Sequence, residues 1–365
     1  MGTIQIKTER SSYPVILEEG AIKKLPARIR ELQPEVTSIL YIIDKTVHTL
    51  HHDYIKEFYP EHKNIHVYII PSGESAKSFK VYEDVLGFAL KAGLDRHSLI
   101  VACGGGATGD LAGFVAASYM RGIRFIQVPT TILAHDSAVG GKVAINHSLG
   151  KNMVGSFHQP SAVIYDIHFL TSLPDEEIKS GFAEVIKHAI IADHDWLQEL
   201  METMPSFTSL TSQKLEIFLK KGIEVKAGIV EQDEKELGIR AFLNFGHTYG
   251  HAIEAWAGYS KWSHGASVMV GMIYALLLSS RLKNLSFETT SFINWIKELG
   301  YEIVPPEDAA FEDLLTLMRK DKKTIANEIR FVLLEEIGQP VVEKVSINDL
   351  VLTDKQIRRL KGEIE

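Results

Sequence analysis

The chain has little of what would link it to an oxidising compartment, a nucleic acid or a membrane. Its 365 residues include one cysteine, Cys103, which excludes an internal disulfide and is typical of a reducing compartment. The formal net charge of −8 argues against general nucleic-acid binding and offers no basic face to a membrane. The N-terminal stretch MGTIQIKTERSSYP lacks the apolar core of a secretory signal, and the longest apolar run, SVMVGMIYALLLSS, is short for a membrane span and predicts a buried helix. Together these absences predict a cytoplasmic protein.

The composition is that of an ordinary globular protein that is large enough for two cores. Hydrophobic residues make up 45% of the chain and charged residues 24%, which is typical of globular domains. A chain of 365 residues exceeds the size at which a single hydrophobic core usually stops growing, so we expect two domains.

The hydrophobic pattern changes near residue 173 and predicts two domains of different kinds. Before that point, helical segments such as FKVYEDVLGFALKAGL and GDLAGFVAASYMRG alternate with the short β-branched runs SILYIID, IHVYIIP, SLIVACGGG, RFIQVPTT and AVIYDI. Near-continuous apolar runs are typical of parallel strands buried on both faces, so residues 1–173 predict an α/β domain. From Pro174, which can occupy a first helical turn, helical periodicity dominates and predicts a mainly α-helical domain over residues 174–365.

A strand that runs into a glycine cluster, in VACGGGATGDLAGF, offers backbone groups to a phosphate. Gly104, Gly105 and Gly106 let backbone amides approach a ligand, and we expect Gly109 to continue the turn. The N-terminus of the following helix favours an anion. The Lys-Ser/Thr ending of a P-loop is absent from this stretch. The local pattern leaves two interpretations open, a phosphate contact and a tight turn without a ligand.

Two further strand ends carry polar residues of the kind that hold a dinucleotide. Asp44 ends the run YIID, where a carboxylate can accept hydrogen bonds from ribose hydroxyls. Taken alone, a helix N-cap or a solvated loop acid is the favoured interpretation of Asp44. Glu74 and Lys77 follow another strand in PSGESAKS. Together with the glycine cluster, these strand ends favour a dinucleotide more than any of them does alone.

The stretch HDSAVGGKVAINHSLGKNMVGSFHQP combines glycines with polar side chains in a long loop. Lys142 follows a Gly-Gly pair, and Lys151 and Asn152 follow a Leu-Gly pair. Asp136 lies near the start of the stretch. Such a mixture indicates contact with an anionic, hydroxylated ligand. A surface excursion with solvated lysines is the alternative, and we consider it the weaker interpretation.

Four side chains of the second half have the chemistry of a metal site. In HTYGH, His247 and His251 share a helical face, and His264 follows beyond a turn. In SGFAEVIKH, Glu184 lies among apolar neighbours, where it needs a cation or hydrogen-bond donors. Two histidines and one carboxylate with an open position are a frequent catalytic zinc arrangement. Core or interface histidines, and an ordinary helical ion pair of Glu184 with Lys187, remain the alternatives.

Cations collect near these segments although the chain is acidic overall. Lys226, Arg240 and Asn244 precede the histidines, and Lys322 and Lys323 precede a final strand-like run. This contrast predicts a locally positive pocket for a phosphate or carboxylate substrate. For each single lysine a solvated surface charge is the alternative, and it carries most weight for the DKK group.

Over nearly its whole length the sequence resembles the 3-dehydroquinate synthase family of sugar phosphate cyclases. The resemblance rests on the segments GGGATGDLAGFVAASYMRGI, QVPTTILAHDSAVGGKVAINHSLGKNMVGSFHQP, LPDEEIKSGFAEVIKH and LNFGHTYGHAIE. It implies a nucleotide-binding, Rossmann-like α/β domain over residues 1–173 and a mainly α-helical metal-binding domain over residues 174–365, usually in a homodimer. It also implies NAD, one divalent metal, Zn2+ or Co2+, and the conversion of 3-deoxy-D-arabino-heptulosonate 7-phosphate to 3-dehydroquinate and phosphate.

The resemblance also implies roles for individual residues. It implies metal ligation by Glu184, His247 and His264. The implied substrate-binding and catalytic residues are Asp136, Lys142, Lys151, Asn152, Lys187, Lys226, Arg240, Asn244, His251 and Lys322 or Lys323. The implied NAD contacts are Asp44, Ser72, Gly73, Glu74, Ser75, Ala76, Lys77, Gly105, Gly106, Ala107, Thr108, Gly109, Asp110, Thr130, Thr131, Lys142, Lys151, Phe169, Leu170, Thr171 and Ser172.

Three other functions compete with the synthase. Other sugar phosphate cyclases share the fold and the metal triad and differ most around GGKVAINHSLGKNM. Metal-dependent polyol dehydrogenases share the broad architecture and would give net oxidation. A non-catalytic regulatory protein would bind no metal and turn over no substrate. We rank all three below the synthase. The lysine-rich loops argue against a polyol dehydrogenase in particular, because it has no leaving phosphate to bind.

Overall fold

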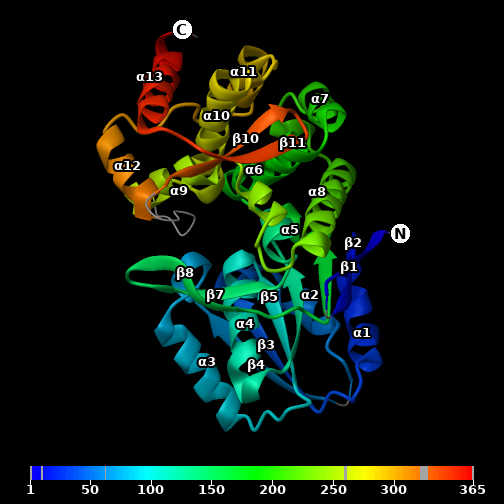
Figure 1. Ribbon diagram of the computed structural model, residues 1–365. Helices are drawn as coiled ribbons and strands as arrows, with labels where there is room; N and C mark the ends of the chain where they lie inside the picture. Colours follow the sequence, from blue (N-terminus) through cyan, green and yellow to red (C-terminus); the bar gives the residue numbers. More distant parts are fainter. Residues whose placement is uncertain (1, 10, 62, 259–260, 321–327, 364–365) are drawn as a thin grey trace. The chain divides into compact units, whose positions relative to one another are not determined.

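The computed structural model of the chain describes residues 2–9, 11–61, 63–258, 261–320 and 328–363 (Figure 1). The chain forms two compact units. The first comprises Met1–Pro174 and Glu216–Lys235, and the second comprises Asp175–Leu215 and Glu236–Glu365. The domain division expected after residue 173 stays a prediction. The contacts within the chain divide it after Pro174 and place most of helix α8 (Ser212–Gln232) with the first unit.

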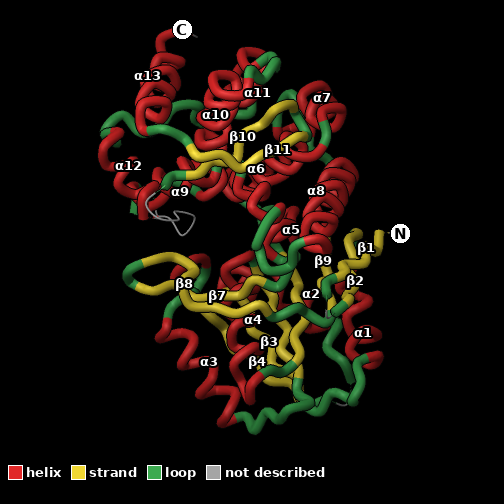
Figure 2. Tube along the Cα trace, viewed as in Figure 1, coloured by secondary structure: helices red, strands yellow, loops and turns green. Residues whose placement is uncertain are grey.

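Within the described residues, a seven-stranded sheet forms the centre of the first unit (Figure 2). Its strand order is β1-β2-β9-β6-β5-β3-β4. β1 pairs antiparallel with β2, and the other neighbours pair in parallel. Parallel neighbours need crossover connections, which gives the Rossmann-like α/β architecture predicted for this half. The strands are β1 (Gly2–Lys7), β2 (Ser12–Glu18), β3 (Ser38–Asp44), β4 (Asn64–Ile70), β5 (Leu99–Gly104), β6 (Arg124–Pro129) and β9 (Ala162–Asp166).

The five predicted strands all form, but one of them is less buried than its sequence suggests. In β3, β5 and β9 every residue is buried, as expected for apolar runs inside a parallel sheet. β4 lies at the edge of the sheet, and most of its residues are half-buried or exposed. The expectation that IHVYIIP is buried on both faces is therefore wrong, because an edge strand has a neighbour on one side only.

Helices pack on both faces of this sheet. One apolar cluster joins the sheet to η1 (Ala21–Lys24), α1 (Leu25–Glu31) and α2 (Lys45–Glu57). A second cluster joins it to α3 (Phe79–Lys91) and α4 (Gly106–Ser118). Successive side chains of a strand point to opposite faces, and in β3 the odd-numbered residues from 39 to 43 join the first cluster while the even-numbered ones join the second.

The polar stretch that we expected to be a long loop forms a hairpin instead. β7 (Lys142–His147) pairs antiparallel with β8 (Gly150–Phe157), separately from the main sheet. Val143 and Ile145 of β7 pack into the apolar cluster of α3 and α4, which anchors the hairpin. The other short elements of this unit are η2 (Gly73–Ala76), η3 (Tyr119–Arg121), α5 (Ala134–Ser137) and η4 (Ile167–Ser172).

The second unit is mainly helical, as the resemblance implies, and also contains a hairpin of β10 (Arg330–Glu336) and β11 (Gln339–Lys344). β10 is the predicted final strand. α6 begins at Asp175, so Pro174 precedes the first helical turn rather than occupying it. The helices are α6 (Asp175–Ala192), α7 (His194–Thr203), η5 (Phe207–Ser209), η6 (Ile239–Asn244), α9 (His247–Trp256), α10 (His264–Lys283), α11 (Thr289–Glu298), α12 (Phe311–Lys320) and α13 (Ile347–Glu363).

α10 lies at the centre of the second unit and contacts α6, α9, α13 and β10. The Ser263 side chain caps its start by accepting a hydrogen bond from the Ala266 N–H, and Asn284 ends it in the left-handed conformation. Among the described residues, it is the one helix long and apolar enough to cross a membrane, and 78% of its apolar window is buried inside the protein. The run SVMVGMIYALLLSS therefore forms the buried helix that its sequence predicts.

Candidate functional site

The three predicted metal ligands of the second unit lie together. Glu184 lies within α6, His247 begins α9 and His264 begins α10. The Nε2 atoms of His264 and His247 lie 3.1 Å and 3.4 Å from the same oxygen, Oε1 of Glu184. The ligand atoms of all three residues lie within 4.8 Å of one another. A tetrahedral metal with bonds of about 2.0–2.1 Å separates its ligand atoms by about 3.3 Å, so this spacing fits one divalent ion.

Close backbone contacts of two glycines set this arrangement. A Cβ at Gly265 would overlap the backbone of Ser180 in α6. A Cβ at Gly271 would overlap the backbone carbonyl of Gly246, the residue that caps α9. Glycine is needed at both positions because no other residue lets the backbones approach so closely. The start of α10 therefore lies against both α6 and α9, which brings the three ligands together.

The second nitrogen of each histidine ring has an acceptor of its own. Nδ1 of His247 lies 3.1 Å from the carbonyl oxygen of Phe245, and Nδ1 of His264 lies 3.1 Å from Oε2 of Glu254. In a neutral ring, a proton on Nδ1 that is donated to these oxygens leaves the lone pair on Nε2, on the side of Glu184. This is the tautomer that a metal ligand requires, so the donor set fits a metal by its chemistry as well as its spacing.

The carboxylate of Glu184 divides its two oxygens between a cation and the histidines. Glu184 is buried, and Nζ of Lys187 lies 2.5 Å from Oε2, so the helical ion pair left open by the sequence does form. Burial opposes ionisation, but the Lys187 ammonium and the histidines hold the pKa of Glu184 well below its usual range. Oε1 therefore belongs to an ionised carboxylate, which is the form that binds a metal.

The two histidines differ in charge before any metal binds. Burial lowers the pKa of His247 to about 3, against the attraction of Glu184, so this ring is neutral. Burial also favours the neutral form of His264, but its hydrogen bonds to Glu184 and Glu254 raise its pKa to about 9. Ligation by His264 therefore displaces a proton, as is usual for metal sites.

His251 lies beside the three predicted ligands. Its half-buried ring has its centroid 5.0 Å from that of His247 and 5.8 Å from that of His264. Together with Glu254 and His264 it forms a second group of side chains that could hold a metal. Position alone does not assign His251 to the metal or to the substrate, and its substrate-facing role stays a prediction.

The other predicted substrate groups of the second unit lie on η6 and α6. Arg240 and Lys187 are each 1% exposed. Asn244 donates a hydrogen bond from Nδ2 to Oε1 of Glu236 at 3.0 Å. Two buried cations and an amide of this kind suit an anionic or hydroxylated ligand. Lys322, like its alternative Lys323, lies outside the described residues.

In the first unit, the glycine cluster forms the turn from β5 into α4. Gly105 occupies the N-cap position, and no side chain in the described part of the chain caps this helix. The first backbone N–H groups of α4, which belong to Gly106, Ala107 and Thr108, are therefore donors that an anion can use. A Cβ at Gly105 would approach Thr131 Cγ2 to 2.9 Å, so glycine keeps the turn open beside another predicted NAD contact. The turn fits a phosphate.

Lys77 joins three segments that carry predicted cofactor and substrate residues. Its Nζ donates to Oδ2 of Asp110 at 2.6 Å and to Oδ1 of Asn152, and it lies 3.9 Å from Oε1 of Glu74. Lys151 lies 2.9 Å from the same oxygen of Glu74. η2, α4 and the hairpin β7–β8 therefore share one network of charged hydrogen bonds. Lys77 is only 3% exposed, so these partners offset the cost of burying its ammonium group.

Asp44 closes β3 and caps α2. Its Oδ1 accepts hydrogen bonds from the backbone N–H of Thr46 at 2.7 Å, from that of Val47 at 3.3 Å and from the Ser72 hydroxyl at 2.8 Å. Its Oδ2 accepts one from the Gly73 N–H at 3.3 Å. The helix cap that the sequence left as an alternative is therefore present. A carboxylate has about four acceptor positions, so Oδ2 can also accept a ribose hydroxyl.

The remaining predicted residues of the first unit lie in helices and at the ends of strands. Lys226 of α8 is buried, lies 3.1 Å from Oδ2 of Asp136 and donates to the Asp136 backbone carbonyl. Lys142 is exposed at the start of β7. The others are Ser72, Ser75 and Ala76 at η2, Gly109 in α4, Thr130 after β6, and Phe169, Leu170, Thr171 and Ser172 in η4.

The sequence motifs did not single out Glu254 or the glycines that set the helix contacts. Glu254 lies seven residues after His247, which places both on one face of α9, and this spacing was the signal for it. Gly265 and Gly271 follow the histidine motif closely, but nothing in their local pattern names the backbone that they approach.

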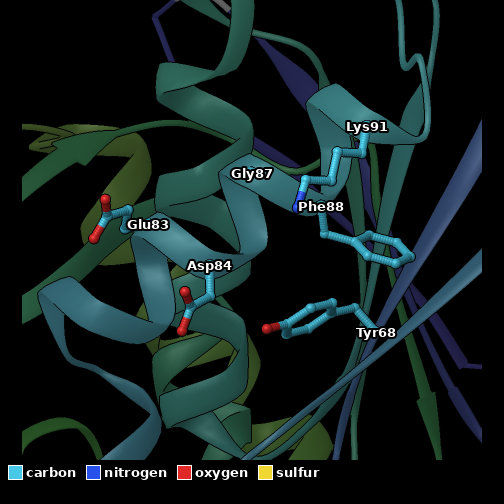
Figure 3. Close-up of a pocket in the computed structure, with 6 residues that line it drawn as sticks. All are labelled: Tyr68, Glu83, Asp84, Gly87, Phe88 and Lys91. Atoms are coloured by element: carbon cyan, nitrogen blue, oxygen red, sulfur yellow. The ribbon is translucent and has the colours of Figure 1, made fainter.

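A hollow of about 400 Å³ on the first unit contains none of the predicted site residues (Figure 3). Tyr68 of β4 and Phe88 of α3 face it, together with Glu83, Asp84, Gly87 and Lys91. It lies beside β4, the edge strand of the sheet.

Comparison with known proteins points to one family along the chain. Family models described as 3-dehydroquinate synthase N-terminal and 3-dehydroquinate synthase C-terminal match residues 67–180 and 181–324. A 3-dehydroquinate synthase of Listeria monocytogenes serotype 4b (strain F2365) is 47% identical over 362 residues, which cover 99% of each chain. A 3-dehydroquinate synthase of Geobacillus kaustophilus (strain HTA426) is 49% identical over 352 residues, which cover 95% of this chain and 94% of that protein.

Solved structures show the same fold over the whole chain. A crystal structure of 2-deoxy-scyllo-inosose synthase complexed with carbaglucose-6-phosphate, NAD+ and Co2+ superposes with a TM-score of 0.87 at 26% identity. The match covers 98% of this chain and 100% of that one. This likeness confirms the predicted fold class, and the full-length relatives confirm the resemblance noted in the sequence. The chain belongs to the 3-dehydroquinate synthase family.

Proposed function

We propose that this chain converts 3-deoxy-D-arabino-heptulosonate 7-phosphate to 3-dehydroquinate and inorganic phosphate, as a phosphorus–oxygen lyase of the shikimate pathway to chorismate and the aromatic amino acids. Relatives named 3-dehydroquinate synthase match it over nearly their whole length at 47–49% identity. The observation that carries the proposal is the convergence of Glu184, His247 and His264 in a buried cluster. A regulatory protein has no need of such a cluster.

We infer that the resident groups are NAD and one divalent metal, Zn2+ or Co2+. The structural relative named 2-deoxy-scyllo-inosose synthase is complexed with NAD+ and Co2+. Glu184, His247 and His264 would hold the metal, which would supply a Lewis acid, while NAD would take up a hydride and return it within one cycle. The NAD assignment rests on the uncapped turn at α4 and on the polar residues around η2.

The proposed work of the protein's own groups is to bind and orient an anionic substrate. A phosphate can leave by elimination if cations stabilise its charge, and the proton lost from carbon can pass to the departing phosphate itself. We assign the binding of substrate anions and hydroxyls to the predicted residues Lys142, Lys151, Asn152, Lys226 and Asp136 of the first unit and Lys187, Arg240, Asn244 and His251 of the second. Lys322 belongs to the same proposal by resemblance alone.

Two further features belong to this proposal. We propose a homodimer, because members of the family usually form one. We propose a cytoplasmic location, because a single buried cysteine suits a reducing compartment. Size measurement in solution tests the first, and fractionation of cells that express a tagged chain tests the second.

Cofactor accounting tests the proposed reaction. The enzyme, Co2+ and substoichiometric NAD+ are mixed with the heptulosonate phosphate, while free phosphate and NADH absorbance are followed together. A transient oxidation regenerates the cofactor, so many turnovers should each release one phosphate without accumulation of NADH. Stoichiometric NADH without phosphate would contradict the synthase and leave a polyol dehydrogenase. Turnover of a different sugar phosphate, with none of this substrate, would identify another cyclase.

A further inference from the structure

We propose that Glu254 is a positioning residue that holds the metal ligand His264 in its binding orientation. The inference rests on the metal centre of the proposed function. The ring of His264 lies between two carboxylates, with Nε2 3.1 Å from Oε1 of Glu184 and Nδ1 3.1 Å from Oε2 of Glu254. Glu254 acts through the ring, from the side opposite to the ion.

The geometry of an imidazole separates the roles of the two carboxylates. Its two nitrogens point away from each other, so an ion bound at Nε2 of His264 cannot also touch a group at Nδ1. Glu254 therefore cannot be a fourth ligand of the ion held by Glu184 and His247. The second group of possible ligands, which includes His251 and Glu254, would need a different ion at the opposite nitrogen.

His264 needs such a partner more than His247 does. His264 is the first residue of α10, and its side chain is 24% exposed, against 11% for His247. The Nδ1 of His247 is held by a backbone carbonyl, that of Phe245, whose position is set by the chain. The Nδ1 of His264 depends on the side chain of Glu254. A carboxylate at this place fixes the ring orientation and raises its basicity toward the metal.

The burial of Glu254 also supports its positioning role. The residue is 4% exposed, and a buried carboxylate is costly unless donors satisfy it. It lies on the same helix as His247, two turns farther along, so α9 supplies both a ligand and the group that orients the next ligand. Glu254 thereby supports the proposed metal site through the ring of His264, without touching the ion.

Metal binding to three variants of the full chain tests the proposal. Glu254→Ala removes the acceptor, Glu254→Gln keeps a neutral acceptor, and Asp354→Asn is a control that neutralises another buried carboxylate, which accepts a hydrogen bond from Tyr249. Co2+ affinity is measured by competition with a chelator, and the visible absorption of bound Co2+ reports its ligand set. We expect Glu254→Ala to bind Co2+ about 10–100-fold more weakly. Glu254→Gln should lie between it and the wild type, and Asp354→Asn should match the wild type.

Three results would overturn the role of Glu254. The first is equal affinity in Glu254→Ala and the wild type, and the second is an equal loss in Asp354→Asn. The third is a changed cobalt spectrum in Glu254→Gln that shows a lost ligand, since a positioning residue leaves the ligand set intact. Circular dichroism of the metal-free variants checks that they fold. Failure of the wild type itself to bind Co2+ would instead contradict the proposed metal centre.

Discussion

The charged residues of the two units are partnered in different ways. In the network around Lys77 in the first unit, each cation lies against a carboxylate, as Lys77 does with Asp110 and Lys151 with Glu74. In the second unit, the acceptor atoms of Glu184 and two histidine rings face one another at a single point. Acceptors that face acceptors repel unless a proton or a cation lies between them. Contacts between cations and carboxylates stabilise the fold, whereas acceptor atoms that converge on one point are typical of a cation-binding site.

The largest expected effect comes from breaking the convergence itself. Glu184→Ala removes the oxygen that faces both histidines, so we expect bound metal to fall from about one per chain to a trace. Phosphate release should fall on the order of 10³-fold, because a Lewis acid contributes several kcal/mol. Metal analysis after dialysis and the phosphate assay measure the two effects. Glu176→Ala, an exposed glutamate of the same helix, is the control, and retention of metal in Glu184→Ala would show that the cluster is structural.

We expect the loss of a charged pair in the first unit to act mainly on the stability of the fold. Lys77→Met leaves the half-buried Asp110 without its cation, and breaking a buried pair costs up to about 3–5 kcal/mol of unfolding free energy. Urea unfolding measures this loss. The exposed pair of Lys80 and Asp84 gives the control, because Lys80→Met should cost less than about 1 kcal/mol. Equal losses in the two variants would show that burial does not increase the stabilisation given by the Lys77–Asp110 pair.

A double variant sharpens the same prediction. Lys77→Met with Asp110→Asn removes both charges together, so no unpaired ion remains. We expect it to be more stable than Lys77→Met alone. An additive loss would mean that the two side chains act independently.

The glycine contacts of the second unit should give a smaller loss that involves both stability and metal binding. Gly265→Ala forces a Cβ against the backbone of Ser180, so we expect a loss of about 1–3 kcal/mol and weaker Co2+ binding. Gly228→Ala in α8 is the control, since nothing lies within 4 Å of its Cβ position and alanine favours a helix by about 0.5–1 kcal/mol. Thermal unfolding with and without metal measures both. Unchanged metal affinity in Gly265→Ala would separate the helix contact from the ligand geometry.

The smallest expected effect concerns the two roles of Asp44. Asn also caps helices, so Asp44→Asn should change the unfolding free energy by less than about 1 kcal/mol. Loss of the negative charge should reduce the preference for NAD over NADP, because the carboxylate repels a 2′-phosphate. Activation by each cofactor, compared with Asp44→Ala, measures the change. A preference that stays the same would leave Asp44 as a helix cap alone.

The parts of the fold that the sequence predicted are those that local pattern determines. The runs that became β3, β5 and β9 are mostly apolar because both faces of a parallel strand are buried. β4 has a similar run but lies at the edge, and position in a sheet depends on distant strands. The hairpin β7–β8 was missed because glycines and lysines interrupt its alternation, while its anchor is a core formed by α3 and α4.

The site, like the fold, could be predicted only where local sequence determines it. Residue chemistry singled out the carboxylate and the histidines, and the resemblance chose among four possible ligands. The structure brings Glu184, His247 and His264 together, although their role as ligands stays a prediction. Glu254 was missed because its importance lies in a contact with a ring on another helix. For Asp44 the sequence left two roles open, and the structure shows the cap while the cofactor role stays untested.

The contact between Gly271 and Gly246 also limits how this chain can diverge. A side chain at position 271 would meet the backbone carbonyl of residue 246, so no exchange of a neighbouring side chain relieves the overlap. A random mutant library selected for growth without aromatic amino acids would thus lose variants at this glycine as thoroughly as at a ligand. Intolerance to mutation in this region therefore marks two classes of residue, and only a metal-binding measurement separates those that hold an ion from those that let two helices touch.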